Sequence, residues 1–269
     1  MKRSATETTA QLIFSHTVAE DYAPLPYRLK GEEDTWLLYL GPRHKDAPMI
    51  DAEAYFQRLL DKLTSPARHL ILSAPAPAPT VEMPWGLERL LASKELLQGF
   101  LYAVLRRSAT CRLSLLLPQA GTPAALAAAH SAVEDAMAQL YAQGIPFDDM
   151  IPIGITLGTP ASLLSAAAFG EAADFAVIDT DILLALSLAA APETAFFEES
   201  LAATLGGILR LSADAVSTLH AAGHYVAISG RLAADAAGRR QAAQLCADAL
   251  ILPFPGLHTP SFSVRTGSK

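Results

Sequence analysis

Two carboxylates stand at a spacing that suits chemistry in the middle of the chain. Asp179 and Asp181 lie two residues apart at the end of the apolar run 174–180. Carboxylate oxygens are the ligands that hard cations such as Mg²⁺ prefer, so the pair is a candidate metal site. The alternative is a solvated or helix-capping role, because aspartate also favours helix N-termini.

Other polar side chains follow further apolar runs. Cationic and hydroxyl groups at such positions could bind an anionic substrate through charge-assisted hydrogen bonds. The candidates for substrate binding are Arg43, His44, Thr159 and Arg231. Ser229 could form a dyad with His16, and the alternative is a satisfied polar rim without catalysis. The sequence holds no GxGxxG, P-loop, HExxH or CxxC pattern.

These side chains must be positioned by eight short apolar runs, separated mostly by helical patterns. The runs lack in/out alternation, which is typical of parallel strands covered by helices. They span 11–15, 35–41, 69–75, 112–118, 151–159, 174–180, 224–230 and 247–253. The helical segments span 51–63, 87–108, 123–144, 160–170, 196–222 and 232–246.

This order predicts an α/β protein with a single (β/α)8 TIM barrel, whose ligands bind at the C-terminal ends of the strands. We expect the first strand and an irregular connection within 1–34, the barrel over 11–253 and a tail over 254–269. The tail contains two prolines and two glycines. The eighth helix is therefore expected to be missing or irregular.

Composition narrows the functional classes. The net charge is −7, and no basic block is present, so we expect no nucleic-acid partner. The apolar stretch 150–170 is long enough for a membrane span, but its prolines and glycines favour a strand, a turn and a helix, so no membrane association is expected. With two cysteines and no signal-peptide pattern, a cytoplasmic location is expected.

Several segments resemble one known family in register. The run IGITLGTPASLLSAAAFGEAADFAVIDTDILLALSLA (153–189) resembles the C-terminal barrel of phosphoenolpyruvate (PEP)-utilising enzymes, whose members include enzyme I of the sugar phosphotransferase system, pyruvate phosphate dikinase and PEP synthase. The segments 37–60, 86–109 and 227–235 resemble the same barrel. The resemblance implies a PEP/pyruvate-type TIM barrel with phosphotransferase chemistry and Mg²⁺.

The residues at the family's metal positions differ from the family pattern. The two carboxylates that bind magnesium in the family correspond to Gly158 and Ile182 here. Asp179 and Asp181 are residual carboxylates nearby, but they are out of register with the family ligands. Because Mg²⁺ is held through carboxylates and substrate oxygens, the resemblance implies that its ligands are lost and that no cofactor is bound.

The positions for phosphate and for proton transfer differ as well. The family's phosphate-binding arginines correspond to Leu40, Trp85 and Glu88, which removes the attraction for phosphate and adds one negative charge. The family's proton-transferring cysteine corresponds to Ser229, whose hydroxyl is a far weaker acid than a thiol. The metal, phosphate and proton-transfer positions therefore all differ from the family pattern.

Two functional classes remain. The first is a non-catalytic regulatory, structural or dimerisation protein descended from the PEP-binding barrel. The second is an enzyme of altered specificity that acts on a small carbonyl or carboxylate compound at the C-terminal strand ends. A metal carboxylate pair or a Schiff-base lysine at a strand end would favour the second class, and the sequence shows neither.

We expect a homodimer. The family barrel commonly dimerises, and a missing eighth helix would expose apolar strand surface that a partner could cover. The N-terminal 30 residues are the competing cover. Light scattering at micromolar concentration checks the expectation, because a mass near the 28.5 kDa of one chain would reject the dimer.

Overall fold

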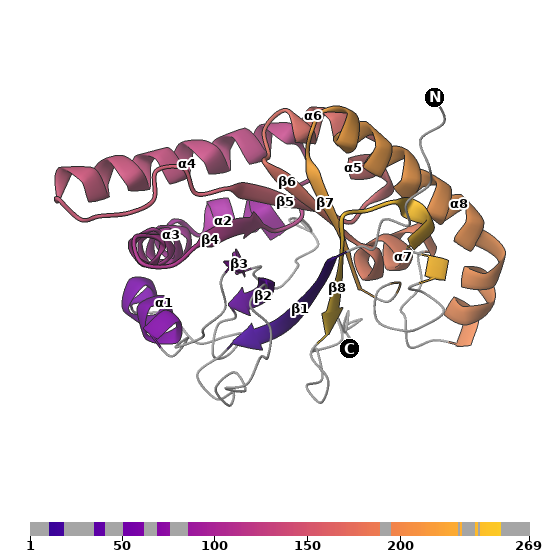
Figure 1. Cartoon of the computed structure of the whole chain (residues 1–269), viewed down its shortest axis with the longest axis horizontal. Helices are drawn as coiled ribbons and strands as arrows, with labels where there is room; N and C mark the ends of the chain where they lie inside the picture. Colours follow the sequence, from indigo (N-terminus) through magenta and orange to yellow (C-terminus); the bar gives the residue numbers. More distant parts are fainter. Residues whose placement is uncertain are drawn as a thin grey trace, which may run out of the picture.

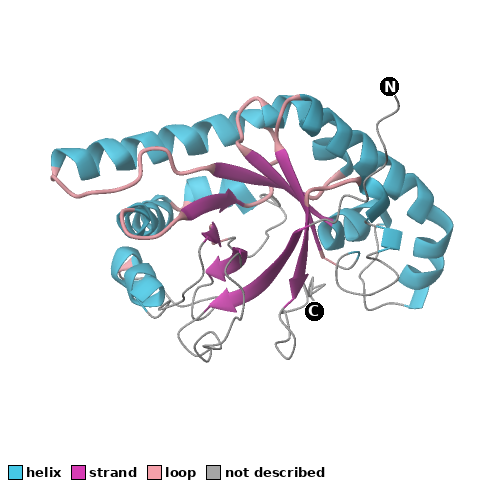
Figure 2. Ribbon diagram, viewed as in Figure 1, coloured by secondary structure: helices cyan, strands magenta, loops and turns pink. Residues whose placement is uncertain are grey.

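A computed structural model describes residues 11–18, 35–40, 51–61, 69–75, 86–188, 195–230, 232, 240–241 and 243–253. It shows an α/β fold built on a curled parallel sheet (Figure 2). The strands are β1 (Gln11–Val18), β2 (Thr35–Leu40), β3 (His69–Ser73), β4 (Leu113–Leu117), β5 (Ile153–Leu157), β6 (Phe175–Asp179), β7 (Tyr225–Ser229) and β8 (Ala249–Pro253). Each lies on one of the eight apolar runs.

The strands pair in chain order. Each neighbouring pair is parallel, and β1 also pairs with β8, so the hydrogen bonds close the sheet on itself. Ile13 of β1 is opposite Ile251 of β8, and Asp179 of β6 is opposite Ser229 of β7. The carboxyl ends of all eight strands therefore meet at one rim, where the sequence predicts the site.

Helices cover the sheet on the left, above and on the right in Figure 1. They are α1 (Ala52–Asp61), α2 (Gly86–Ala92), α3 (Lys94–Ser108), α4 (Pro123–Ala142), α5 (Pro160–Leu164), α6 (Ala166–Gly170), α7 (Thr180–Leu188) and α8 (Ala195–Ala221), with a short 3-10 helix η1 (Ala243–Leu245). The expected helix 232–246 falls partly outside the described residues. The first connection and the tail lie entirely outside them.

Helix boundaries follow local chemistry. The Thr122 hydroxyl accepts a hydrogen bond from Ala125 N, and Pro123 occupies the first turn, as the sequence predicts for a capped helix start. Gly144, just beyond α4, has a φ of 68°, which glycine adopts without strain. Two expected helices are each divided, at Ser93 and at Ser165, where the backbone leaves the helical region, with φ −94° and ψ 65° at Ser93 and φ −101° and ψ 20° at Ser165.

The core has two layers. The inner layer lies within the ring of strands and consists of Leu37, Ile71, Leu116, Phe175, Val177, Ala227, Ala249 and Ile251. The outer layer lies between strands and helices and contains the largest fully buried side chains of the helices, including Phe56, Phe100 and Phe169. Burial on both faces explains why the strands lack polar alternation.

Two aspartates tie neighbouring strand starts together in the same way. The Asp174 carboxylate accepts a hydrogen bond from Ile153 N at 2.7 Å, and the Asp248 carboxylate accepts one from Val226 N, also at 2.7 Å. In each case the aspartate N–H donates back to the carbonyl of the same partner, at 2.8 and 2.9 Å. The pattern fixes the start of β6 against β5 and of β8 against β7.

We expect Asp248→Ala to lower the free energy of unfolding by about 1–3 kcal/mol, because it leaves the amide of Val226 without its acceptor. Asp248 also pairs with His220 at 2.9 Å, on side chains that are about one-third exposed. His220→Ala is the matched control and should cost less than about 1 kcal/mol. Denaturant unfolding of both variants checks this, and equal losses would show that the ion pair carries the effect.

No helix within the described ranges is long and apolar enough to cross a membrane.

Candidate functional site

The carboxyl ends of β6 and β7 bring two of the predicted site residues together. Val177 and Ala227 belong to the inner core, and side chains two positions further along a strand point to the same side. Asp179 and Ser229 therefore face the inside of the rim, and the strand register places them opposite each other.

Asp179 caps the helix that follows it. One of its carboxylate oxygens accepts hydrogen bonds from Asp181 N at 2.9 Å and Ile182 N at 3.1 Å, in the first turn of α7. Burial, and secondarily the negative charge of Asp181, raises the pKa of Asp179 to about 6. The group can therefore gain or lose a proton in the neutral to mildly acidic range.

The geometry gives Asp179 a helix-capping role. Asp181 is exposed, whereas Asp179 uses an oxygen on backbone amides. Among the described residues, no group of three or more His, Cys, Asp or Glu side chains could hold a metal ion. The capping role, which the sequence left open beside the metal role, accounts for the contacts of Asp179.

Thr180 is a structural residue of the rim that the sequence analysis did not single out. Its hydroxyl donates to the carbonyl of Ser229 at 2.6 Å and accepts from Leu232 N at 3.3 Å. Gly230 has a φ of 85° and lies so close that an added Cβ would be 2.8 Å from Thr180 Oγ1. The position of Thr180 between two aspartates at the end of an apolar run is the sequence signal that could have identified it.

Ser229 and Thr159 are both buried, and the hydroxyl group of each forms a hydrogen bond within the protein. The Ser229 hydroxyl donates to the carbonyl of Ile178 at 3.5 Å. The Thr159 hydroxyl caps α5 by accepting from Ser162 N at 2.9 Å, and the Ser162 hydroxyl accepts from Thr159 N at 3.1 Å. This capping box occupies the hydroxyl that the sequence assigned to substrate binding.

The remaining candidates are not joined to this cluster. Arg43, His44 and Arg231 lie outside the described residues. His16 lies on β1, where the register pairs it with Leu38 of β2, and its dyad with Ser229 stays a prediction.

Gly158 and Ile182 are in direct contact at the end of β5. A Cβ atom added to Gly158 would lie 2.8 Å from the Cβ and 2.9 Å from the Cγ2 of Ile182. The side-chain oxygen of Gln119 accepts a hydrogen bond from Gly158 N and would be 3.2 Å from the same Cβ. Side chains of residues 119 and 182 thus fill the space beside Gly158.

Glu88 lies in the first turn of α2. One of its oxygens accepts a hydrogen bond from Gly121 N at 2.8 Å. Its other oxygen is buried and has no hydrogen-bond partner among the described residues. The carbonyl of Gln119 accepts from Leu87 N at 3.0 Å, which holds α2 against the end of β4. This part of the rim therefore presents a negative charge.

The family comparison matches most of these elements. A family model described as the PEP-binding domain of PEP-utilising enzymes matches residues 85–251, from just before α2 into β8. The chain belongs to this family. The resemblance noted in the sequence is thereby confirmed.

Curated relatives of this PEP-binding domain are PEP-protein phosphotransferases. The protein from Haemophilus influenzae is 28% identical over 145 residues, which is 54% of this chain and 25% of that protein. The protein from Buchnera aphidicola subsp. Acyrthosiphon pisum is 30% identical over 142 residues, or 53% of this chain and 25% of that protein. The matched region thus spans about a quarter of these relatives.

Solved structures with a related shape include a citrate lyase from Burkholderia xenovorans. It has a TM-score of 0.48 at 14% identity, covering 81% of this chain and 72% of that chain.

Proposed function

We propose that this PEP-binding-domain protein has lost the magnesium, phosphate and cysteine positions of its family and acts as a non-catalytic regulatory, structural or dimerisation protein. The observation that carries the proposal is the contact between Gly158 and Ile182. These are the two positions that correspond to the family's metal carboxylates, and they lie side by side with no ligand atom on either side chain.

The residues present do not fit Mg²⁺ at that place. Magnesium demands near-octahedral oxygen coordination and is usually anchored by one or two carboxylates. The Ile182 side chain instead packs against the backbone of Gly158, and the Gln119 oxygen is already engaged with Gly158 N. A carboxylate at position 158 would collide with Ile182, so this place does not fit a magnesium ion.

The charge of the neighbouring rim also supports the proposal. Glu88 corresponds to a phosphate-binding arginine of the family, and its carboxylate is held in place by Gly121 N. A carboxylate at this position repels the phosphate of PEP, where an arginine would attract it. Ser229, at the position of the family cysteine, uses its hydroxyl on a backbone carbonyl.

For the whole chain we propose a complete (β/α)8 barrel of the PEP/pyruvate type that assembles as a homodimer in the cytoplasm. The closed pairing of the eight strands supports the barrel. The family resemblance supports the dimer, because barrels of this family commonly dimerise.

Magnesium and PEP together should leave the melting temperature of this protein unchanged. A site filled at 100 times its dissociation constant adds about 2.7 kcal/mol to the free energy of unfolding. For a chain of this size such a gain raises the melting temperature by several degrees. A saturable rise that needs both Mg²⁺ and PEP would overturn the proposal. The PEP-protein phosphotransferase from Haemophilus influenzae serves as the positive control.

A second function is favoured by one observation, the raised pKa of Asp179. A carboxyl group with a pKa of about 6 at a strand end, opposite Ser229, is suited to acid–base chemistry near neutral pH. This would be an enzyme of altered specificity acting on a small carbonyl or carboxylate compound. A thermal-shift screen of such compounds separates the two functions, because only the second predicts a stabilising ligand whose effect disappears in Asp179→Ala.

A further inference from the structure

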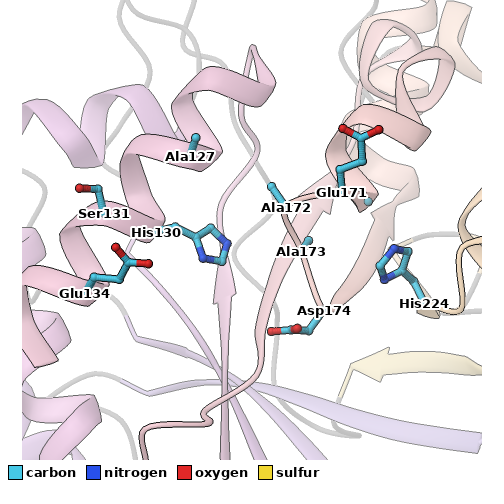
Figure 3. Close-up of a pocket in the computed structure, with 10 residues that line it drawn as sticks. Ala127, His130, Ser131, Glu134, Glu171, Ala172, Ala173, Asp174 and His224 are labelled. Carbon is cyan, nitrogen blue, oxygen red and sulfur yellow. The ribbon is translucent and has the colours of Figure 1, made fainter.

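A cavity lies at the opposite end of the strands from the candidate site. Its volume is about 530 Å³, within the range of small-molecule sites. One wall is the face of α4 that carries His130 and Glu134. The other wall is the turn that leads from α6 into β6, with Glu171 and Asp174, and it ends at His224 before β7 (Figure 3). These residues precede strands, so the cavity is separate from the carboxyl rim.

The charges around this cavity are of one sign. Glu134, Glu171 and Asp174 each carry a carboxylate that is exposed to solvent. Within the described ranges, no lysine or arginine forms an ion pair with any of them. One carboxylate oxygen of Asp174 accepts a hydrogen bond from Ile153 N, so its other oxygen can contact a ligand. The cavity therefore attracts cations.

An unsatisfied ring nitrogen supports a ligand independently of these charges. Nε2 of His130 is buried and has no hydrogen-bond partner in the described part of the chain. The ring points from α4 across the cavity toward the segment that carries Ala172 and Asp174 (Figure 3). Buried polar atoms normally have a partner, so this nitrogen is a place where a ligand N–H could donate.

The arrangement selects against a metal ion and for a longer organic cation. The His, Asp and Glu side chains of the cavity do not converge closely enough for three of them to hold one metal ion. The carboxylates instead lie on opposite walls, and Ala172 lies in the space between them in Figure 3. An aliphatic stem fits against such small apolar groups, while an ammonium group at each end reaches a carboxylate.

We propose that this cavity binds an aliphatic diamine or polyamine. One ammonium group pairs with Glu134 near His130, and the other pairs with Glu171 or Asp174 on the facing wall. The site is independent of the proposed function at the carboxyl rim, so either can fail without the other.

Isothermal titration with 1,4-diaminobutane and with spermidine tests the proposal on the full chain. We expect saturable one-site binding, at least tenfold tighter than for n-butylamine, which has only one ammonium group. Glu134→Gln and Glu171→Gln should each weaken binding at least fivefold. Asp135→Asn is the matched control, because Asp135 is an exposed carboxylate on the same helix that does not line the cavity.

The possible results of these titrations distinguish a specific binding site from diffuse attraction to the protein. Unchanged binding in Asp135→Asn, with weaker binding in both glutamine variants, supports the site. Absence of saturation at 10 mM diamine, or equal weakening by Asp135→Asn, would overturn it, because either result shows only diffuse attraction to a negatively charged protein. The glutamine substitutions lie on exposed side chains, and circular dichroism confirms that each variant is folded before titration.

Discussion

Gly158→Ala is expected to destabilise this protein by about 1–3 kcal/mol, although it adds one methyl group. The added Cβ would lie 2.8 Å from the Cβ of Ile182, a separation that real Cβ atoms essentially never show, so the β5 end or α7 must shift. Ile182→Gly in the same chain should remove the collision, because it removes both the Cβ and the Cγ2 atoms that the new methyl group would meet. The double variant should therefore be more stable than the sum of the two single losses predicts, by about 1–2 kcal/mol.

A matched control is available in α8. Gly206 is exposed within that helix, and nothing lies within 4 Å of a Cβ added to it. Gly206→Ala should be neutral or stabilising by up to about 1 kcal/mol, because alanine favours helix more than glycine does. Denaturant unfolding measures all four variants. If Gly158→Ala were as stable as the parent chain, Ile182 would not fill the space that we assign to it.

Asp179→Asn is expected to make the protein more stable at pH 8 by about 1–2 kcal/mol and to leave it nearly unchanged at pH 4. The pKa of Asp179 is about 6 in the folded chain against 3.8 ordinarily, so the folded state holds a proton that the unfolded state releases. Stability contributed by this group therefore falls as pH rises from about 4 to 6. Asparagine keeps the capping oxygen without the charge.

His69 works in the opposite direction and must be separated from Asp179. Burial, and secondarily the charge of Arg112, lowers the pKa of His69 to about 4, and its ring nitrogen lies 2.8 Å from the Ser114 hydroxyl. Its contribution to stability is lost as pH falls from about 6.5 to 4. The difference between Asp179→Asn and the parent chain cancels this effect. A constant difference from pH 4 to pH 8 would contradict the raised pKa.

Much of the architecture could be predicted because the strands are buried on both faces. Continuous apolar runs such as 112–118 and 174–180 are typical of central strands, and β4 and β6 lie within them. The helix α7 was missed because the sequence DILLALSL has no polar face. It therefore lacks the alternation of apolar and polar residues by which a helix is predicted from sequence. The breaks at Ser93 and Ser165 were missed because the surrounding residues favour helix on both sides.

The site was predictable only in part. Position along the strands placed Asp179 and Ser229 at the same rim, and the structure brings them opposite each other. The capping role of Thr159 follows from the Thr-Pro sequence, which marks a helix start more directly than a ligand contact. The contact of Gly158 with Ile182 joins two elements, β5 and α7, so no local pattern could reveal it; only the family alignment placed both positions at one site.

The binding of Mn²⁺ in the presence of saturating PEP tests the central claim most directly, because Mn²⁺ accepts the oxygen ligands that suit Mg²⁺. Free Mn²⁺ can be followed by electron paramagnetic resonance while the protein is titrated. We expect the protein to leave Mn²⁺ free throughout the titration, because the side chains at positions 158 and 182 offer no ligand atom. Stoichiometric uptake of one Mn²⁺ by the unaltered chain, dependent on PEP, would contradict the claim that Ile182 and Gly158 have replaced the metal site.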